Sequence, residues 1–288
     1  MTSLARQLKK LQIPGHLAGA AATKFRTKAS LLFDPKEAAD IDNETIFALG
    51  NNGLDELKAI EPSFGKFQIT LFSESSKSLE RTLETKKVNE RLDKQISKLL
   101  LCLSPYILLK PAQKVLEWLI RRFAIHVHNV DELVRCVLPY HETKLFARVI
   151  QILSISDPWA KWNWLQPLQK SGSPLPRIAV IQRCITDPSF LALICDMIPQ
   201  ALENDCSVSS IRVLFAFYAS TVVAVLEQIN RVTEELLARL LPYFLRGLKS
   251  KISELQAASY MILGQLCMKC SLEEKLLKSL SESICKVR

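Results

Sequence analysis

Residues 242–266 read PYFLRGLKSKISELQAASYMILGQL, and this stretch carries the pattern that decides the fold. Apolar residues at Phe244, Leu245 and Leu248 precede a polar break at Ser250, and a second apolar run ends at Leu266. Spacings of three and four residues are typical of amphipathic helices. The stretch therefore predicts two antiparallel helices joined by a short turn, with a proline in the first helix and alanines in the second.

This proline-containing helix, short turn and alanine-containing helix approximate one HEAT unit, and similar helices recur along the chain. Residues 50–53 (GNNG) are expected to interrupt the helix that starts at Asp42 or Asn43. The other predicted helices cover residues 75–83, 88–103, 112–123, 130–138, 142–153, 178–185, 189–202, 209–229, 234–248, 252–268 and 272–285. We therefore predict an all-α fold, a HEAT-like α-solenoid of stacked antiparallel helix pairs.

Three similar phrases support a repeat. They are LSPY at 103–106, VLPY at 137–140 and LLPY at 240–243. The prolines fall at positions 105, 139 and 242, so the second interval is about three times the first. The phrases are consistent with equivalent places in successive repeats.

The composition agrees with a helical globular chain. Of 288 residues, 48% are apolar and 23% are charged, which excludes wholesale disorder. Only 8 residues are glycine, which disfavours folds built on tight turns or phosphate-binding loops. The longest uncharged stretch near position 220, residues 213–226, is shorter than the roughly 20 residues that span a bilayer, so we expect no membrane partner.

We divide the chain into four parts. They are a basic N-terminal arm or first helix at 1–30, helical repeats at 31–156, an irregular Trp- and Pro-rich connection at 157–177, and HEAT-like repeats at 178–288. The arm has no acidic residue and holds six of the nine net positive charges. It is consistent with a mitochondrial transit peptide, a nucleic-acid-binding arm or a first solenoid helix. Any strong attraction to nucleic acid is expected from this arm.

The sequence offers few candidates for catalysis or metal binding. No phosphate-binding, nucleophile-elbow or zinc-protease motif is present. Cys267 and Cys270 have the spacing of half a zinc or redox site, but two thiols at the end of a packed helix are the favoured interpretation. The histidines His16, His126, His128 and His141 are isolated along the chain. We therefore predict no catalytic residue, no cofactor and no metal, and an enzyme using the two cysteines is the least favoured hypothesis.

Basic and aromatic residues are the remaining candidates for partner contact. Trp159, Trp162 and Trp164 are suited either to stacking on bases or, more often, to sealing a loop onto a core. Basic residues that point to partner or RNA contact, or that simply solvate helix faces, are Lys9, Lys10, Arg121, Arg122, Lys249 and Lys251. For Arg121 and Arg122 we expect a surface position, so that reversing their charge would leave the fold intact.

Several longer phrases resemble a known family. They are LLFDPKEAA at 31–39, LSPY at 103–106, LLKPAQK at 108–114 with EWLI at 117–120, VLPYHET at 137–143 and FAFYAST at 215–221. In this order they are similar to the start of the large HEAT-repeat U3 small nucleolar ribonucleoprotein subunit of the small-subunit processome. The resemblance covers nearly the whole chain.

The resemblance implies a non-catalytic scaffold that is the N-terminal portion of a longer nucleolar protein. The implied role is support of ribosomal DNA transcription, pre-rRNA processing and 18S rRNA maturation. The implied partners are other processome subunits, including WD-repeat propeller proteins, together with pre-rRNA and U3 small nucleolar RNA, bound directly or indirectly. The alternative hypothesis, which rests on the acid-free arm, is a mitochondrial helical-repeat protein that binds RNA or protein.

Overall fold

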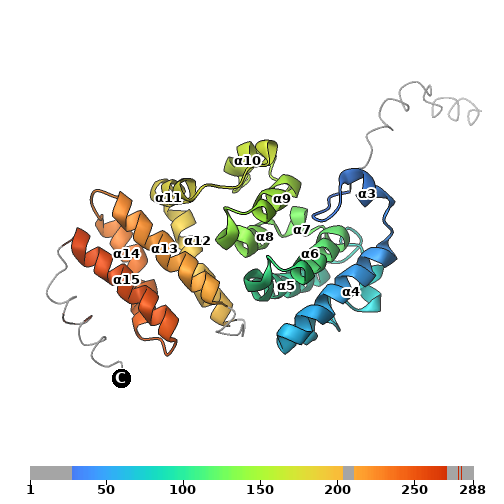
Figure 1. The fold of residues 1–288 in the computed structure, drawn as a ribbon, viewed down its shortest axis with the longest axis horizontal. Helices are drawn as coiled ribbons and strands as arrows, with labels where there is room; N and C mark the ends of the chain where they lie inside the picture. Colours follow the sequence, from blue (N-terminus) through green and yellow to red (C-terminus); the bar gives the residue numbers. More distant parts are fainter. Residues whose placement is uncertain (1–27, 204–210, 271–277, 279, 281–288) are drawn as a thin grey trace, which may run out of the picture.

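The fold is a curved row of packed helices, seen in a computed structural model that describes residues 28–203, 211–270, 278 and 280 (Figure 1). The arm residues Lys9 and Lys10, His16, Cys206 and nearly all of the helix predicted at 272–285 lie outside the described residues. The described α-helices, in chain order, are α3 (Pro35–Asp40), α4 (Asn43–Ile60), α5 (Lys86–Leu103), α6 (Lys110–Phe123), α7 (Ile125–His128), α8 (Val130–Val137), α9 (Lys144–Ile152), α10 (Gln166–Ser171), α11 (Arg177–Thr186), α12 (Pro188–Glu203), α13 (Arg212–Gln228), α14 (Glu234–Leu248) and α15 (Ser253–Lys269).

Short 3-10 segments connect several of these helices, and the described residues form no strand. The segments are η1 (Pro62–Phe67), η2 (Glu74–Lys77), η3 (Ser104–Tyr106), η4 (Leu138–Tyr140) and η5 (Asn163–Leu165). The prediction of an all-α helical solenoid is confirmed. Helix starts follow the capping residues in the sequence: the carboxylate of Asp42 accepts from the amide of Thr45 at 2.7 Å before α4, and Thr233 accepts from Leu236 at 3.2 Å before α14.

The expected break at residues 50–53 is wrong, because α4 runs unbroken through both glycines. A Cβ atom on Gly50 would lie 2.6 Å from the Cβ of Trp118, and one on Gly53 would lie 2.6 Å from the carbonyl oxygen of Pro111. Both neighbours belong to α6. The glycines therefore let two helix backbones approach each other and do not end the helix.

The helix expected at 75–83 is also absent; a short 3-10 segment, η2, and turns occupy this stretch. Serine hydroxyls here bond to nearby carbonyls: Ser76 donates to the carbonyl of Ser73 at 2.6 Å, and Ser78 donates to that of Ser75 at 3.2 Å. Such local bonds compete with helical hydrogen bonding. They account for a turn in a stretch whose apolar spacing permits a helix.

The three proline phrases are not structurally equivalent. The first two form η3 and η4, which follow directly on α5 and α8, and they touch each other: the hydroxyl of Tyr140 donates to the carbonyl of Pro105 at 3.2 Å. The third phrase lies inside α14, with Pro242 in the helix interior. Since proline has no N–H, the carbonyl of Ala238 lacks its helical partner at this point.

Successive helices pack side by side along the row: α4 on α6, α11 on α12 and α13, and α14 and α13 on α15 (Figure 1). The α14–α15 pair follows the predicted unit. Its closest approach lies at Gly247, where a Cβ would meet the hydroxyl of the buried Ser259. That hydroxyl donates to the carbonyl of Leu255 at 2.9 Å, so the small polar group is satisfied within α15.

The tryptophan-rich connection is built of short helices, η5 and α10. Trp162 is 2% exposed and its indole N–H donates to a carboxylate oxygen of Asp131 at 2.6 Å, while Trp164 packs edge-on against Phe190. These two rings seal the connection onto the core, as the favoured interpretation predicts. Trp159 differs, because 93% of its surface is exposed.

A membrane-spanning helix is not found among the described residues. No single helix there is long and apolar enough to cross a bilayer. α11 and α12 reach that length and apolar character only when taken together, and they are bent by 112° relative to each other.

The glycine contacts give a paired prediction. Replacing Gly50 by alanine should destabilise the fold by about 1–3 kcal/mol, because the new methyl group overlaps Trp118. Gly264 is exposed in α15, and a Cβ added there would meet no other atom within 4 Å. Its replacement by alanine should stabilise the fold by up to about 1 kcal/mol, since alanine is the better helix former. Urea unfolding followed by circular dichroism measures both; stabilisation by Gly50→Ala would contradict the close approach.

Candidate functional site

The most elaborate polar site in the described fold surrounds Glu117. This side chain lies on α6 in the apolar run from Val115 to Ile120 and is 0% exposed. Its carboxylate accepts three hydrogen bonds from one short segment before α3: from the hydroxyl of Ser30 at 2.8 Å, and from the amides of Leu31 at 2.7 Å and Leu32 at 3.2 Å. A buried carboxylate of this kind is tolerated only where donors replace its lost hydration.

Arg148 of α9 binds the carbonyl groups of the same segment. Its guanidinium donates to the carbonyl of Leu31 at 3.4 Å and to that of Phe33 at 2.9 Å. Residues 30–33 together with Glu117 and Arg148 are called the Glu117 clamp here. Because one residue lies on α6 and the other on α9, the clamp ties the start of the described chain to two separate helices.

The sequence pattern assigned no role to Glu117 or Arg148. One signal was present, since a glutamate in the middle of an otherwise apolar stripe predicts a buried charge with a dedicated partner. The partner itself lies 85 to 87 residues away in sequence. No spacing rule for helices or strands identifies a contact at that separation.

The expectation that Arg121 and Arg122 lie on the surface is wrong. The Arg121 side chain is 4% exposed; it donates to the carbonyl of Ile41 at 3.2 Å and lies 4.0 Å from the carboxylate of Glu117. Arg122 donates to the carbonyl of Leu79. Burial lowers the pKa of both guanidinium groups, while Glu117 partly raises that of Arg121. Both bases therefore act inside the fold, and charge reversal is expected to disrupt it.

Lys249 and Lys251 are exposed in the turn between α14 and α15, and neither side chain has a hydrogen bond or ion pair with a described residue. Their contact with a partner stays a prediction, as does that of Lys9 and Lys10, which lie outside the described residues. A pair of free lysines in one turn has the charge for a phosphate or carboxylate but does not define which is bound.

The cysteine pair does not form a metal site in the part of the chain that the structure describes, where no three His, Cys, Asp or Glu side chains cluster suitably. Cys267 is exposed, and Cys270, partly buried, donates to the carbonyl of Leu266 at 3.3 Å. Burial, followed by the nearby Cys267, raises the pKa of Cys270. The arrangement is that of two thiols at the end of a packed helix.

The described histidines do not share one site. Burial and then the neighbouring His128 lower the pKa of His126. His141 is 7% exposed, and its Nδ1 lies 2.7 Å from the carbonyl oxygen of Leu175, which ties η4 to the segment before α11. His126 and His128 belong to α7 and His141 follows η4, so the described rings lie at two separate places in the fold.

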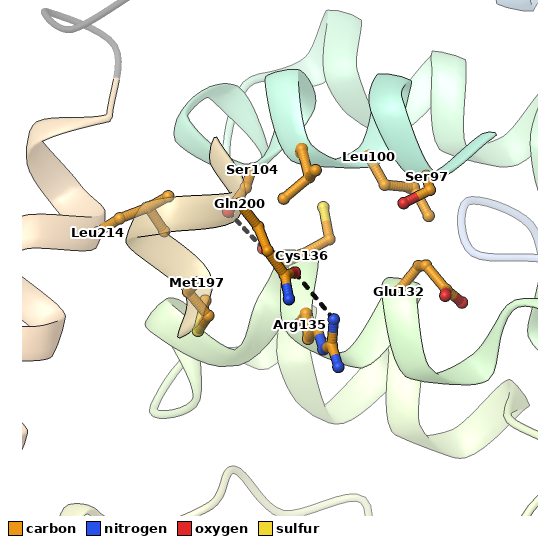
Figure 2. Close-up of a pocket in the computed structure, with 10 residues that line it drawn as sticks. Ser97, Leu100, Ser104, Glu132, Arg135, Cys136, Met197, Gln200 and Leu214 are labelled. Carbon is orange, nitrogen blue, oxygen red and sulfur yellow. Dashed lines mark hydrogen bonds between the residues drawn. The ribbon is translucent and has the colours of Figure 1, made fainter. Parts of the chain in front are cut away.

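Figure 2 shows a small cavity where α5, α8, α12 and α13 meet. Arg135 reaches across it and donates to the side-chain oxygen of Gln200 at 2.9 Å, while the hydroxyl of Ser104 donates to the carbonyl of Cys136 at 2.7 Å. Its volume of about 20 Å³ has room for a water molecule and no cofactor. The polar lining therefore joins helices and does not bind a small molecule.

A larger hollow of about 260 Å³ lies between α12 and α14, bordered by Leu191, Cys195 and Tyr243 among others. The hydroxyl of Tyr243, which borders the hollow, donates to a carboxylate oxygen of Asp196 at 2.8 Å and so links the two helices. The hollow is close in size to the smallest ligand pockets, but its convergent polar groups are already paired.

A row of stacked helix pairs, held by buried clamps and without a catalytic cluster among its described residues, defines an all-α helical-repeat protein. Residues 236–288 match the family described as U3 small nucleolar RNA-associated protein 10. The chain belongs to the HEAT repeat-containing protein 1 family and corresponds to a part of those longer proteins.

Comparison with curated proteins carries this assignment. The chain is 48% identical over 99% of its length to HEAT repeat-containing protein 1 of Homo sapiens, and 47% identical over 98% to that of Danio rerio. It is 31% identical over 98% to U3 small nucleolar RNA-associated protein 10 of Aspergillus oryzae. The chain spans 13% of the length of the two vertebrate relatives and 16% of the fungal one.

The Glu117 clamp predicts a large stability effect from one substitution. Glu117→Leu should destabilise the fold by about 3–5 kcal/mol, because it leaves the amides of Leu31 and Leu32 without their acceptor and the buried Arg121 without its neighbouring carboxylate. The exposed Glu142→Leu serves as the control and should change stability by less than about 0.5 kcal/mol. Urea unfolding measures both. Equal unfolding midpoints for the two variants would show that the clamp carries little of the stability.

Thiol labelling tests the placement of the cysteines. Iodoacetamide should modify Cys267 in the native protein and leave Cys136, Cys184 and Cys195 unmodified, because burial raises the pKa of all three and that of Cys184 to about 12. Peptide mass spectrometry identifies the modified thiols, and the same reaction in denaturant should label every one. Rapid native labelling of Cys195 would contradict a closed core between α11, α12 and α13.

Proposed function

We propose that this chain forms part of a non-catalytic scaffold subunit of the small-subunit processome, which assembles on nascent pre-rRNA in the nucleolus. The single observation that carries the proposal is 48% identity over 99% of the chain to a relative of that family. Its role there is to support ribosomal DNA transcription, pre-rRNA processing and 18S rRNA maturation.

The physical basis of the proposed role is position. In a solenoid each helix pair buries its apolar face only against its neighbours, so the remaining faces stay available to other molecules along the whole row. The buried clamp and the close glycine contacts support this by fixing α4 against α6, α14 against α15, and residues 30–33 against α6 and α9. Such an array holds several partners at defined separations without a chemical step of its own.

The proposed partners are other processome subunits, including WD-repeat propeller proteins, with pre-rRNA and U3 small nucleolar RNA bound directly or through those subunits. The fungal relatives are named U3 small nucleolar RNA-associated proteins, which supports RNA-containing particles as the partners. Lys249 and Lys251 are proposed contacts, because they are exposed in the turn between α14 and α15. Lys9 and Lys10 are proposed contacts on the charge of the arm alone.

The proposal predicts recovery of U3 small nucleolar RNA with the tagged chain. The chain is expressed in cultured human cells, purified from nuclear extract at moderate salt, and U3 is quantified by reverse transcription against an abundant cytoplasmic RNA. Enrichment of U3 is expected for the parent chain and for Glu142→Leu, and loss for Glu117→Leu. Recovery of the tagged chain in mitochondria, with residues 1–30 cleaved off, would overturn the proposal in favour of the mitochondrial alternative.

A further inference from the structure

The exposed side of α5 carries an unusual concentration of positive charge. Apart from its partly buried positions, this helix exposes five bases and one acid between Lys86 and Lys98. The acid, Glu90, lies 3.9 Å from Lys86, with which it forms an ion pair. Asp93, the other acid of the helix, is already bound by Arg81 and by the amide of Asn129.

Four bases remain: Lys87, Arg91, Lys94 and Lys98, which are called the α5 stripe here. They are separated by four, three and four residues, the spacing that places side chains in one line on a helix. None of the four side chains has a hydrogen bond or ion pair with any described residue. At a rise of about 1.5 Å per residue, the line is about 17 Å long with a charge roughly every 5–6 Å.

The core fixes the direction in which the stripe faces. The opposite side of α5 carries Leu92, Ile96, Leu99 and Leu103, all buried, and α5 packs on α8, η1 and η3. Rotation of the helix would expose these apolar side chains to water, which is unfavourable. The four bases are therefore held together on the outer surface although nothing within the described fold pairs with them.

We propose that the α5 stripe binds the phosphodiester backbone of RNA. A regular line of unpaired bases matches a ligand that repeats a single negative charge at short intervals, and lysine binds phosphate as a point charge. Protein interfaces are depleted in lysine and centre on apolar or aromatic anchors, and the exposed side of the helix from Lys87 to Lys98 presents none. Contact with phosphates alone predicts binding with little preference for base sequence.

This inference deepens the proposed function and rests on it for the choice of RNA as the nucleic acid in the cell. It also differs from the expectation that nucleic-acid attraction belongs to the N-terminal arm. Outside the arm the chain carries a net charge of only about +3. This small net charge does not reveal the line of four bases on α5, whose neighbouring acids, Glu90 and Asp93, already form ion pairs.

The test measures binding of the 288-residue chain to a labelled single-stranded RNA of about 20 nucleotides by fluorescence anisotropy at several salt concentrations. Glutamine replaces Lys87, Arg91, Lys94 and Lys98 together in the test variant. Near 0.1 M salt we expect affinity to fall by about tenfold or more, and the slope of log affinity against log salt to decrease by about 3. A duplex RNA of equal length should show the same ranking of proteins.

The matched control removes the same charge from elsewhere. Lys36, Lys110, Lys144 and Lys170 are exposed, lack described partners and lie on α3, α6, α9 and α10, so their joint replacement by glutamine breaks no contact. We expect this control to weaken binding by less than about threefold. Both variants keep residues 1–30, and both should give the circular dichroism spectrum and melting temperature of the parent chain.

The outcomes separate this inference from the proposed function. Parent-like RNA binding by the stripe variant, equal loss in the control, or no RNA binding by the parent chain would each overturn the α5 stripe as an RNA site. Loss of binding to a polyglutamate peptide with RNA binding retained would assign the stripe to an acidic protein instead. If the parent chain fails to recover U3 but the stripe carries RNA binding, the proposed function fails and the stripe stands.

Discussion

The buried carboxylate of Glu117 is the interaction on which the first half of the structure depends. A single side chain on α6 replaces the hydration of its charge with two backbone amides and a hydroxyl, all from residues 30–32. Arg148 binds the carbonyls of the same segment from α9. Leaving the carboxylate or its backbone donors unpaired would cost several kcal/mol. Residues 30–33 are therefore held in one position, and α6 and α9 are held with them.

Close backbone approach provides the second constraint. Gly50 and Gly53 allow α4 to contact α6 at distances that any side chain would prevent, and Gly247 allows the same between α14 and α15. These contacts lie at opposite ends of the described row. In a row of stacked helices, such local contacts set how each layer lies on the next and so contribute to the geometry of the array.

Charge is divided between two uses in this protein. Arg121, whose side chain is buried, and Arg122 and Arg148, which are partly buried, donate to backbone carbonyls, and Arg121 also lies beside Glu117. The lysines of the α5 stripe and of the α14–α15 turn remain in solvent without partners among the described residues. The proposed scaffold role draws on the second group alone, since a base already buried and bonded within the fold is out of reach of a phosphate.

The sequence by itself determined the all-α class and most of the helices in their order, because apolar spacing and capping residues act within a few positions of one another. It predicted α14 with both ends correct and identified the α14–α15 pair as a repeat unit. It could not distinguish a glycine that ends a helix from one that admits a neighbour, or an arginine on the surface from one that binds a distant carbonyl. Only the tertiary structure decided these roles. Gly50 meets Trp118, and Glu117 meets Leu31, across long separations in sequence, so the role of each residue depends on a partner that its own position does not reveal.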